Sequence, residues 1–337
     1  MPRTTTPPVS ALLKGRHARL ATALALALLA AVLWGVHRFV GWDTVAATAA
    51  TIPASTWVAF ACMLGLSYAA RVLRLWRLLH DIDPAVRGSR VTLTFFVHNA
   101  LATLLPARLG EAGMPLLARR WLGMDWAATV GALAWWRVSD LAVVGAIALA
   151  LLASGARVLA PLYALALATC ALPLVVFAVR TPLMRAAAGR SARVAGLVHR
   201  VLGGMPGRWT ALVADLALAL MAWLTKLVAF TLLLDAGLRA VGSAGPLPQP
   251  TLVAAAALAA DAAGALPLPT VGGVGPFEGG IVLGLGALGV PAAHALGLAI
   301  TLHGAVLGSI VASGVLALAV ALPLTRRHAG AVRTRAT

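Results

Sequence analysis

Long apolar runs separated by short basic segments dominate the chain. A helix that crosses a bilayer needs about 20 predominantly apolar residues, and six runs reach that length. The predicted spans are residues 20–40, 55–79, 127–153, 158–179, 209–238 and 291–322. Two further apolar stretches, residues 91–121 and 251–290, are interrupted by proline and glycine. The pattern predicts an all-α polytopic membrane protein with about six full transmembrane helices plus two re-entrant or broken helical hairpins.

Each broken stretch begins with an apolar run that is too short to cross the membrane. In the first, only about 15 residues precede Pro106 and Gly110, against the roughly 20 that a span requires. In the second, residues 251–266 precede a segment rich in proline and glycine, which interrupts a regular helix. We interpret both as re-entrant hairpins that enter from opposite faces, so that the two halves resemble an inverted repeat. Two broken full-length spans in their place also fit the hydropathy.

Basic residues gather between the apolar runs. The chain has 27 lysine and arginine residues against 10 acidic residues, a net charge of +17. Short basic segments normally face the cytoplasm, which places both terminal tails, residues 1–19 and 326–337, on that side. The remainder, residues 20–325, is expected to form one membrane domain. Its first half is predicted at residues 20–179 and its second half at residues 209–325. The segment that joins them, residues 180–208, is predicted to be a basic amphipathic helix on the membrane surface.

Composition narrows the class of protein further. Apolar residues make up 61% of the chain and charged residues 11%, whereas a soluble domain is about a quarter charged. The distribution of arginine among membrane loops favours anionic lipids as partners and argues against nucleic acid. Cys62 and Cys170 lie inside apolar runs and do not have a metal-ligand spacing. Because no catalytic set or metal-ligand cluster is recognisable, we expect no enzymatic activity and no cofactor.

The two glutamates of the chain both lie in the broken stretches. One is Glu111, and the other, Glu278, follows a proline that suits the first position of a helix. The carboxylate of Glu278 is therefore expected close to unpaired backbone N–H groups at the positive end of that helix. Gly272, Gly273 and Gly275 permit unusual backbone dihedrals and the close approach of a ligand to the backbone.

Charged residues within the apolar runs are a second group of candidates. Arg137 and Asp140 lie three residues apart on one helical face, where they can pair. Lys226 lies about 16 Å along the axis from the acidic residue in its own span, so it needs a partner on another segment. In the first broken stretch, Arg108 can pair with Glu111 or bind a phosphate in bidentate fashion. We expect Lys226 and Arg137 to meet the two glutamates.

Two other sets of polar residues have more than one interpretation. Arg71, Arg74 and Arg77 share a helical face, either as a positive-inside signal or as a row that binds phosphate at the inner leaflet. Histidines within the spans, among them His98 and His303, are expected to be helix-interior residues, and each is a candidate proton relay.

Three motifs in the chain resemble the transmembrane region of lysylphosphatidylglycerol synthases. They are Leu105-Pro-Ala-Arg-Leu-Gly-Glu111, Arg137-Val-Ser-Asp140 and Gly272-Gly-Val-Gly-Pro-Phe-Glu278. The resemblance extends over roughly residues 15–325 and implies a lipid translocase or another lipid-handling membrane module. Full-length synthases attach a soluble aminoacyl-transferase domain, and this activity is expected to be absent here. The chain departs from the family pattern at three positions. Met114 and His303 stand where the family often has Arg, and Trp136 stands where it usually has Glu.

Together these observations predict a flippase-like transporter of the bacterial inner membrane. It would move an anionic or aminoacylated phospholipid, or a lipid-linked precursor, between leaflets. The alternatives are a non-catalytic membrane module that assists a partner lipid aminoacyl- or glycosyl-transferase, and a scaffold that transports nothing. The candidate substrate residues are Asn99, Arg108, Glu111, Arg137, Asp140, Lys226, Asp261, Gly272, Gly273, Gly275 and Glu278. The cations would handle an anionic head group, and the carboxylates would balance them, bind a cationic group or carry protons.

Overall fold

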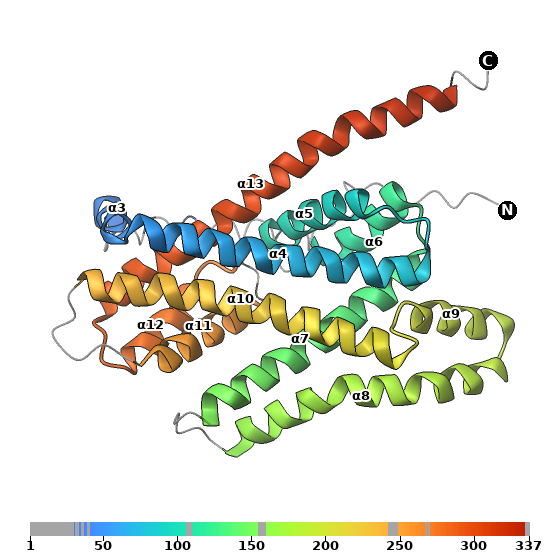
Figure 1. Ribbon diagram of the computed structural model, residues 1–337, viewed down its shortest axis with the longest axis horizontal. Coiled ribbons are helices and arrows are strands. Elements are labelled where there is room, and N and C mark those ends of the chain that lie inside the picture. The colour runs from blue at the N-terminus through green and yellow to red at the C-terminus, as the bar shows by residue number, and fades with distance from the viewer. Residues whose placement is uncertain are drawn as a thin grey trace.

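The protein is an assembly of helices, seen here in a computed structural model (Figure 1). The structure describes residues 30, 34, 37–38, 41–105, 110–153, 160–241, 249–266, 268 and 270–333. Within these ranges every regular element is helical. The elements are α3 (Trp42–Thr51), α4 (Ala54–Ile82), α5 (Gly88–Leu104), α6 (Gly113–Leu117), the π-helical turn η3 (Ala118–Leu122), α7 (Trp126–Ala153), α8 (Ala160–Ala188), α9 (Ala192–Gly203), α10 (Trp209–Val241), α11 (Pro250–Gly264), α12 (Pro276–Gly286) and α13 (Ala292–Arg333).

Five helices are long and apolar enough to cross a membrane: α4, α7, α8, α10 and α13. They coincide with five of the six predicted spans, which confirms the all-α, multi-pass architecture. The first predicted span, residues 20–40, lies outside the described residues apart from four isolated positions. Helix α3, which precedes α4, was not predicted, because its ten residues are too short and too polar to read as a span.

The basic segment 180–208 differs from the single surface helix that its spacing predicts. Residues 180–188 continue α8, with Pro182 inside the helix, and α9 is a separate helix of 12 residues. Ser191 caps α9 by accepting a hydrogen bond from the Val194 N–H. Helix α9 packs against both α7 and α8, and a Cβ added to Gly131 of α7 would lie only 1.8 Å from the Val201 carbonyl oxygen. The basic segment that the charge pattern predicts as one surface helix therefore consists of the end of α8 and a separate α9, which packs on small residues of α7.

Both interrupted stretches form pairs of helices, and residues 106–109 between the helices of the first pair lie outside the described residues. Helix α5 packs against α6 and η3 across the first break, and α11 packs against α12 across the second. The second pair is tight because small residues face one another: Gly280 lies against Ala260 and Gly284 against Ala256. In a bilayer such small-residue contacts let backbones approach closely, which strengthens van der Waals packing. The breaks coincide with the proline- and glycine-rich segments, as the sequence predicts.

The α11–α12 contact gives a direct test of this packing. A Cβ at Gly280 would lie 2.5 Å from Ala260 Cα, whereas a Cβ at the adjacent Gly279 meets nothing within 4 Å. We expect Gly280→Ala to lower the free energy of unfolding by about 1–3 kcal/mol through overpacking. Gly279→Ala is the matched control and should be neutral or stabilising by about 0.5–1 kcal/mol. Thermal unfolding of the purified variants measures both, and equal effects would contradict the packing described here.

The two broken pairs lie toward opposite ends of the molecule. Figure 1 shows α5 and α6 on the side of α9, and α11 and α12 on the side of α3. Their breaks meet between these ends, where the Gly272 N–H donates a hydrogen bond of 2.8 Å to the Thr103 carbonyl oxygen. Segments some 170 residues apart in sequence are therefore joined through backbone groups that the breaks leave unpaired in their own helices.

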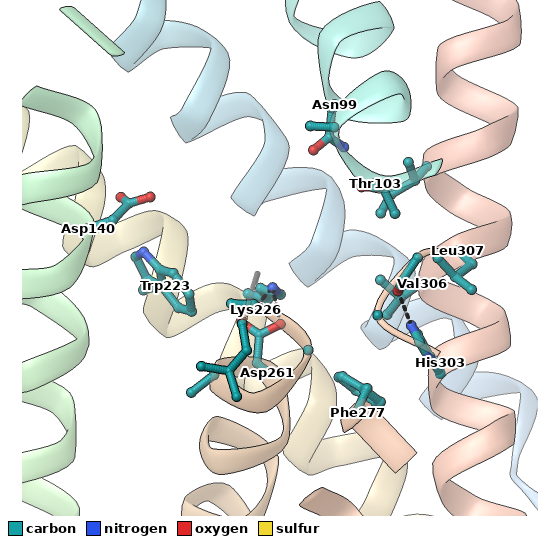
Figure 2. A pocket seen from close by; sticks show the side chains of 18 of the residues that line it. Asn99, Thr103, Asp140, Trp223, Lys226, Asp261, Phe277, His303, Val306 and Leu307 are labelled. Atoms are coloured by element: carbon teal, nitrogen blue, oxygen red, sulfur yellow. Dashed lines mark hydrogen bonds and ion pairs between the residues drawn. The ribbon is translucent and has the colours of Figure 1, made fainter. Parts of the chain in front are cut away.

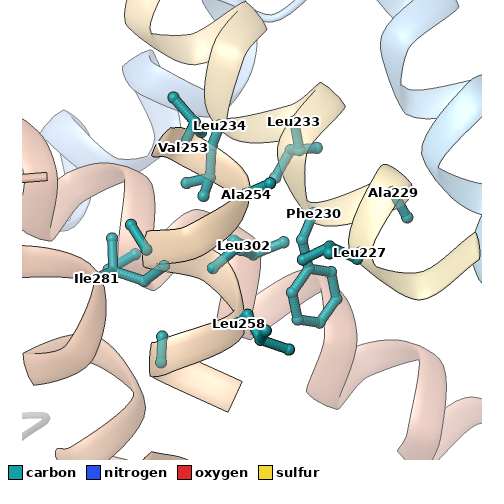
Figure 3. Packing of buried hydrophobic residues seen from close by; sticks show 14 of the residues in the cluster. Leu227, Ala229, Phe230, Leu233, Leu234, Val253, Ala254, Leu258, Ile281 and Leu302 are labelled. Carbon is teal, nitrogen blue, oxygen red and sulfur yellow. The ribbon is translucent and has the colours of Figure 1, made fainter. Parts of the chain in front are cut away.

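Apolar side chains from α10, α11, α12 and α13 hold the second broken pair in place. Figure 3 shows Phe230 of α10 next to Leu258 of α11 and Leu233 next to Ala254, with Leu302 of α13 close by. A second cluster surrounds Trp135 of α7, which is fully buried. Helices α4 and α10 run side by side (Figure 1) and contribute residues to both clusters. This frame leaves the breaks facing an internal cavity.

Candidate functional site

A cavity of about 460 Å³ lies where the two breaks meet. Its wall is formed by α4, α5, α7, α10, α11, α12, α13 and the break between α11 and α12, and Figure 2 labels ten of its residues. One part of the wall is apolar, including Leu64, Val144, Leu307 and Ile310. The remaining part of the wall carries charged and polar side chains. Which of these side chains already have hydrogen-bond or ion-pair partners determines what the cavity can bind.

A buried cluster of ions lies behind the cavity wall and is centred on Arg74, whose side chain is 1% exposed. Its Nε donates to Asp215 Oδ1 at 2.8 Å, and its Nη1 donates to Asp140 Oδ1 at 2.5 Å. The indole N–H groups of Trp135 and Trp136 donate to the remaining carboxylate oxygens, each at 2.9 Å. Every charged member therefore has a partner, as a buried ion requires.

This cluster corrects two predictions. Asp140 does not pair with Arg137 on its own helix. It pairs instead with Arg74 of α4. The arginine row is likewise not a single functional surface. Arg74 is a buried structural ion, Arg77 is exposed and lies outside the cavity, and Arg71 lines the cavity.

Arg137 instead pairs with Glu111, as expected for a cation meeting the glutamate of the first break. The Arg137 side chain is 47% exposed and Glu111 25%, so the pair lies at an open part of the wall. Partly exposed pairs of this kind contribute only about 0–1 kcal/mol to stability. Arg137 can therefore exchange its carboxylate for another anion at low cost. The predicted alternative partner of Glu111, Arg108, lies outside the described residues.

Lys226 has the partner on another segment that its position requires. Its Nζ lies 2.7 Å from both oxygens of Asp261 on α11 and is also 5.1 Å from the centroid of the Trp223 ring. Figure 2 shows the pair at the floor of the cavity. The expectation that Lys226 meets one of the two glutamates is wrong, because its ammonium group binds both carboxylate oxygens of Asp261 instead.

Glu278 is held at the start of α12 in the position that the sequence predicts. The Gly275 N–H donates to Glu278 Oε2 at 2.7 Å, which satisfies one of the unpaired groups at the helix end. The φ angle of Gly275 is 97°, and Gly272 and Gly273 also have positive φ, a conformation that glycine adopts without strain. The partner of Glu278 is His303 on α13, whose Nδ1 lies 2.7 Å from Oε1.

Three donors in the cavity wall lack a matching acceptor among the described residues. The Arg71 guanidinium comes no closer than 4.0 Å to a carboxylate oxygen, that of Asp140, and this oxygen already accepts from Trp136. Asn99 Nδ2 and Trp223 Nε1 are buried without a hydrogen-bond partner. The carboxylates that line the cavity, in contrast, all have cationic partners. The carboxylates of the wall are therefore paired, whereas the Arg71 guanidinium has no carboxylate oxygen within hydrogen-bond distance.

Most predicted site residues contribute to this cavity. Those in its wall are Asn99, Glu111, Arg137, Asp140, Lys226, Asp261, Gly272 and Gly273. Gly275 and Glu278 lie just behind it, at the start of α12. The sequence analysis missed Arg71 and Trp223 as cavity residues and His303 as the partner of Glu278. Two signals were present: Arg71 begins the arginine row, and His303 stands at a position where the family often has a cation.

Comparison with known protein families gives a match over nearly the whole chain. The family model described as the lysylphosphatidylglycerol synthase TM region matches residues 22–325. No curated protein matches the chain. The matched region includes the five long apolar helices, both broken pairs and every residue of the cavity wall. The chain is therefore a multi-pass membrane protein that belongs to the family of lysylphosphatidylglycerol synthase transmembrane regions.

Proposed function

We propose that this protein is a flippase-like transporter that moves an anionic phospholipid, an aminoacylated phospholipid or a lipid-linked precursor between membrane leaflets. It performs no covalent chemistry of its own. The observation that carries the proposal is the Arg71 guanidinium in the wall of the cavity where the breaks meet. Its nearest carboxylate oxygen, on Asp140, is 4.0 Å away, beyond hydrogen-bond distance, and phosphate and ester oxygens are acceptors.

Arg71 is the group best suited to a phosphate. A guanidinium presents five N–H donors in a planar fork that binds phosphate in bidentate fashion. The Arg71 guanidinium lies 5.2 Å from the centroid of the Trp223 ring, a cation–π contact that fixes its direction without consuming its donors. Arg137, at the open part of the wall, is positioned to receive the head group before it reaches Arg71. The apolar wall of Leu64 and Leu307 suits an acyl chain.

The broken helices supply a route for the head group through the apolar layer. Irregular backbone is tolerated at membrane depth only where protein buries it or a wet cavity meets it, and both breaks border this cavity. We propose that the α5–α6 and α11–α12 pairs are re-entrant hairpins from opposite faces, as in transporters with inverted repeats. The positive charge of the segments between spans assigns both termini and residues 180–208 to the cytoplasmic side of a bacterial inner membrane.

A scrambling assay on the purified protein tests this function. Liposomes containing the protein and fluorescent phosphatidylglycerol should show loss of the protected inner-leaflet signal after an impermeant quencher is added, whereas empty liposomes should retain it. Fluorescent phosphatidylcholine gives the contrast for a head group without net charge. If folded protein moves neither lipid, transport by the isolated chain is refuted. A role as a membrane module for a partner lipid transferase would then replace it.

A further inference from the structure

His303 has an acceptor opposite each of its ring nitrogens. Nδ1 lies 2.7 Å from Glu278 Oε1, and Nε2 lies 2.9 Å from the Gly272 carbonyl oxygen. Figure 2 shows His303 beside Phe277, whose ring stacks on the imidazole at a centroid distance of 4.3 Å. A carbonyl oxygen only accepts hydrogen bonds, so Nε2 must carry a hydrogen.

Counting hydrogens shows that the two contacts need one proton more than a neutral imidazole and a carboxylate possess. Either Nδ1–H donates to the carboxylate from an imidazolium, or a protonated Glu278 donates from Oε1 to Nδ1. Both arrangements keep Nε2–H on the Gly272 carbonyl. If this proton leaves, one of the two ring nitrogens has no hydrogen, and its lone pair faces the lone pair of its acceptor, so that contact is no longer attractive. The second oxygen of Glu278, Oε2, does not replace Oε1 in this contact, because it accepts a hydrogen bond from the Gly275 N–H.

We propose that His303 and Glu278 form a proton-binding site, and that the bound proton fastens the break between α11 and α12 to α13. Protonated, the pair attaches both the start of α12, through Glu278, and residues 270–275, through Gly272. Release of the proton to water in the cavity, which His303 lines, breaks one of these two contacts and so weakens the attachment. The inference concerns the resting protein and goes beyond the proposed lipid transport.

The attachment extends across both halves of the cavity. Gly272 accepts from His303 through its carbonyl oxygen and donates through its N–H to Thr103 at the end of α5. The protonated His303–Glu278 pair is therefore linked, through the backbone of Gly272 in the second break, to Thr103 beside the first break. Loosening this chain would widen the cavity where the two breaks meet.

Other ionisable groups near α13 already have their own partners or lie elsewhere on their helices. Helix α12 contributes only Glu278. On α10, Asp215 pairs with Arg74, Lys226 with Asp261 and Asp235 with Arg239, and Tyr68 of α4 bonds to Ser309 of α13. The remaining ionisable residues on α13 and on the helices that pack against it are Asp43 of α3, Arg90 and His98 of α5, and His294 of α13, together with Arg326, Arg327, His328 and Arg333 at the C-terminal end of α13.

Hydrogen exchange of the purified protein between pH 6 and pH 9 tests the proposal without measuring transport. The readout is amide protection of residues 270–276, corrected for the intrinsic pH dependence of exchange. Because the proposed opening releases the bound proton, linkage predicts that protection in the wild type falls as the pH rises. The neighbouring residues 251–260 of α11 should keep constant protection and serve as the internal control.

Two variants separate the proton from other effects of pH. His303→Arg carries a permanent charge and several donors, and His303→Gln has no titrating group, so protection of residues 270–276 should be independent of pH in both. A flat wild-type profile overturns the proposal by itself, even if a variant fails to fold. An equal slope in wild type and His303→Arg overturns it as well. Because lipid movement is not measured, these results stand apart from the outcome of the scrambling assay.

Discussion

Replacing Arg71 by glutamine should abolish most lipid movement while leaving the protein folded. Arg71 lines the cavity, and its nearest carboxylate oxygen, on Asp140, is 4.0 Å away and already bonded. Hydrogen bonds to charged groups contribute about 1.5–3 kcal/mol each, so loss of one such contact to phosphate should weaken lipid binding roughly ten- to hundredfold. The fluorescent phosphatidylglycerol assay measures the rate, and a lipid titration of the purified variant measures the affinity.

Arg77→Gln is the matched control for this experiment. It makes the same change on the same helix, but Arg77 is exposed and lies outside the cavity wall. It should retain the wild-type rate. The assignment of Arg71 to a phosphate is wrong if both variants lose activity equally, or if Arg71→Gln moves lipid at the wild-type rate. A variant that melts far below the wild type would instead show that Arg71 has a structural role.

The largest loss of stability is expected at the buried ion cluster, from Asp215→Asn or Arg74→Gln. Asp215 accepts from Arg74 at 2.8 Å and from Trp135 at 2.9 Å and is 4% exposed. Removing one partner of a buried pair leaves the other charge uncompensated and typically costs about 3–5 kcal/mol. Arg74→Gln removes the hydrogen-bonded cation of two buried carboxylates, Asp140 and Asp215, and should be the more severe change. Thermal unfolding of both variants measures the difference.

Asp235→Asn provides a comparison on the same helix as Asp215. Asp235 pairs with Arg239, which is 59% exposed, and pairs of that kind contribute about 0–1 kcal/mol. Its melting temperature should therefore stay close to that of the wild type. If Asp215→Asn unfolds no more easily than Asp235→Asn, the cluster around Arg74 is not a determinant of stability.

The sequence predicted several features of the site because local physics determines them. Broken apolar runs marked the two helix pairs, since several proline and glycine residues close together disfavour a regular helix. The position of Glu278 at the start of α12 followed from Pro276 and from the unpaired N–H groups that every helix start presents. The need of Lys226 for a partner on another segment followed from the cost of an isolated charge in an apolar layer.

The choice of partner could not be predicted in the same way. Asp140 was assigned to Arg137 by spacing along one helix, yet it pairs with Arg74 from another. The identity of the cation opposite Glu278 was missed for the same reason, because His303 is 25 residues away in sequence. Spacing along a chain restricts which residues share a face, but a pair between helices depends on how those helices cross.

The sequence by itself determined that the chain is a multi-pass membrane protein, where its apolar helices and breaks lie, and which family it resembles. These properties depend on composition and short-range pattern, which each segment carries independently of its neighbours. Only the tertiary structure decided that both breaks meet at Gly272 and Thr103, that Arg71 lies in the cavity wall with its nearest carboxylate oxygen 4.0 Å away, and that His303 faces two acceptors. Such properties arise because packing of small residues fixes the positions of distant helices, and buried polar groups then bond to whatever lies within reach.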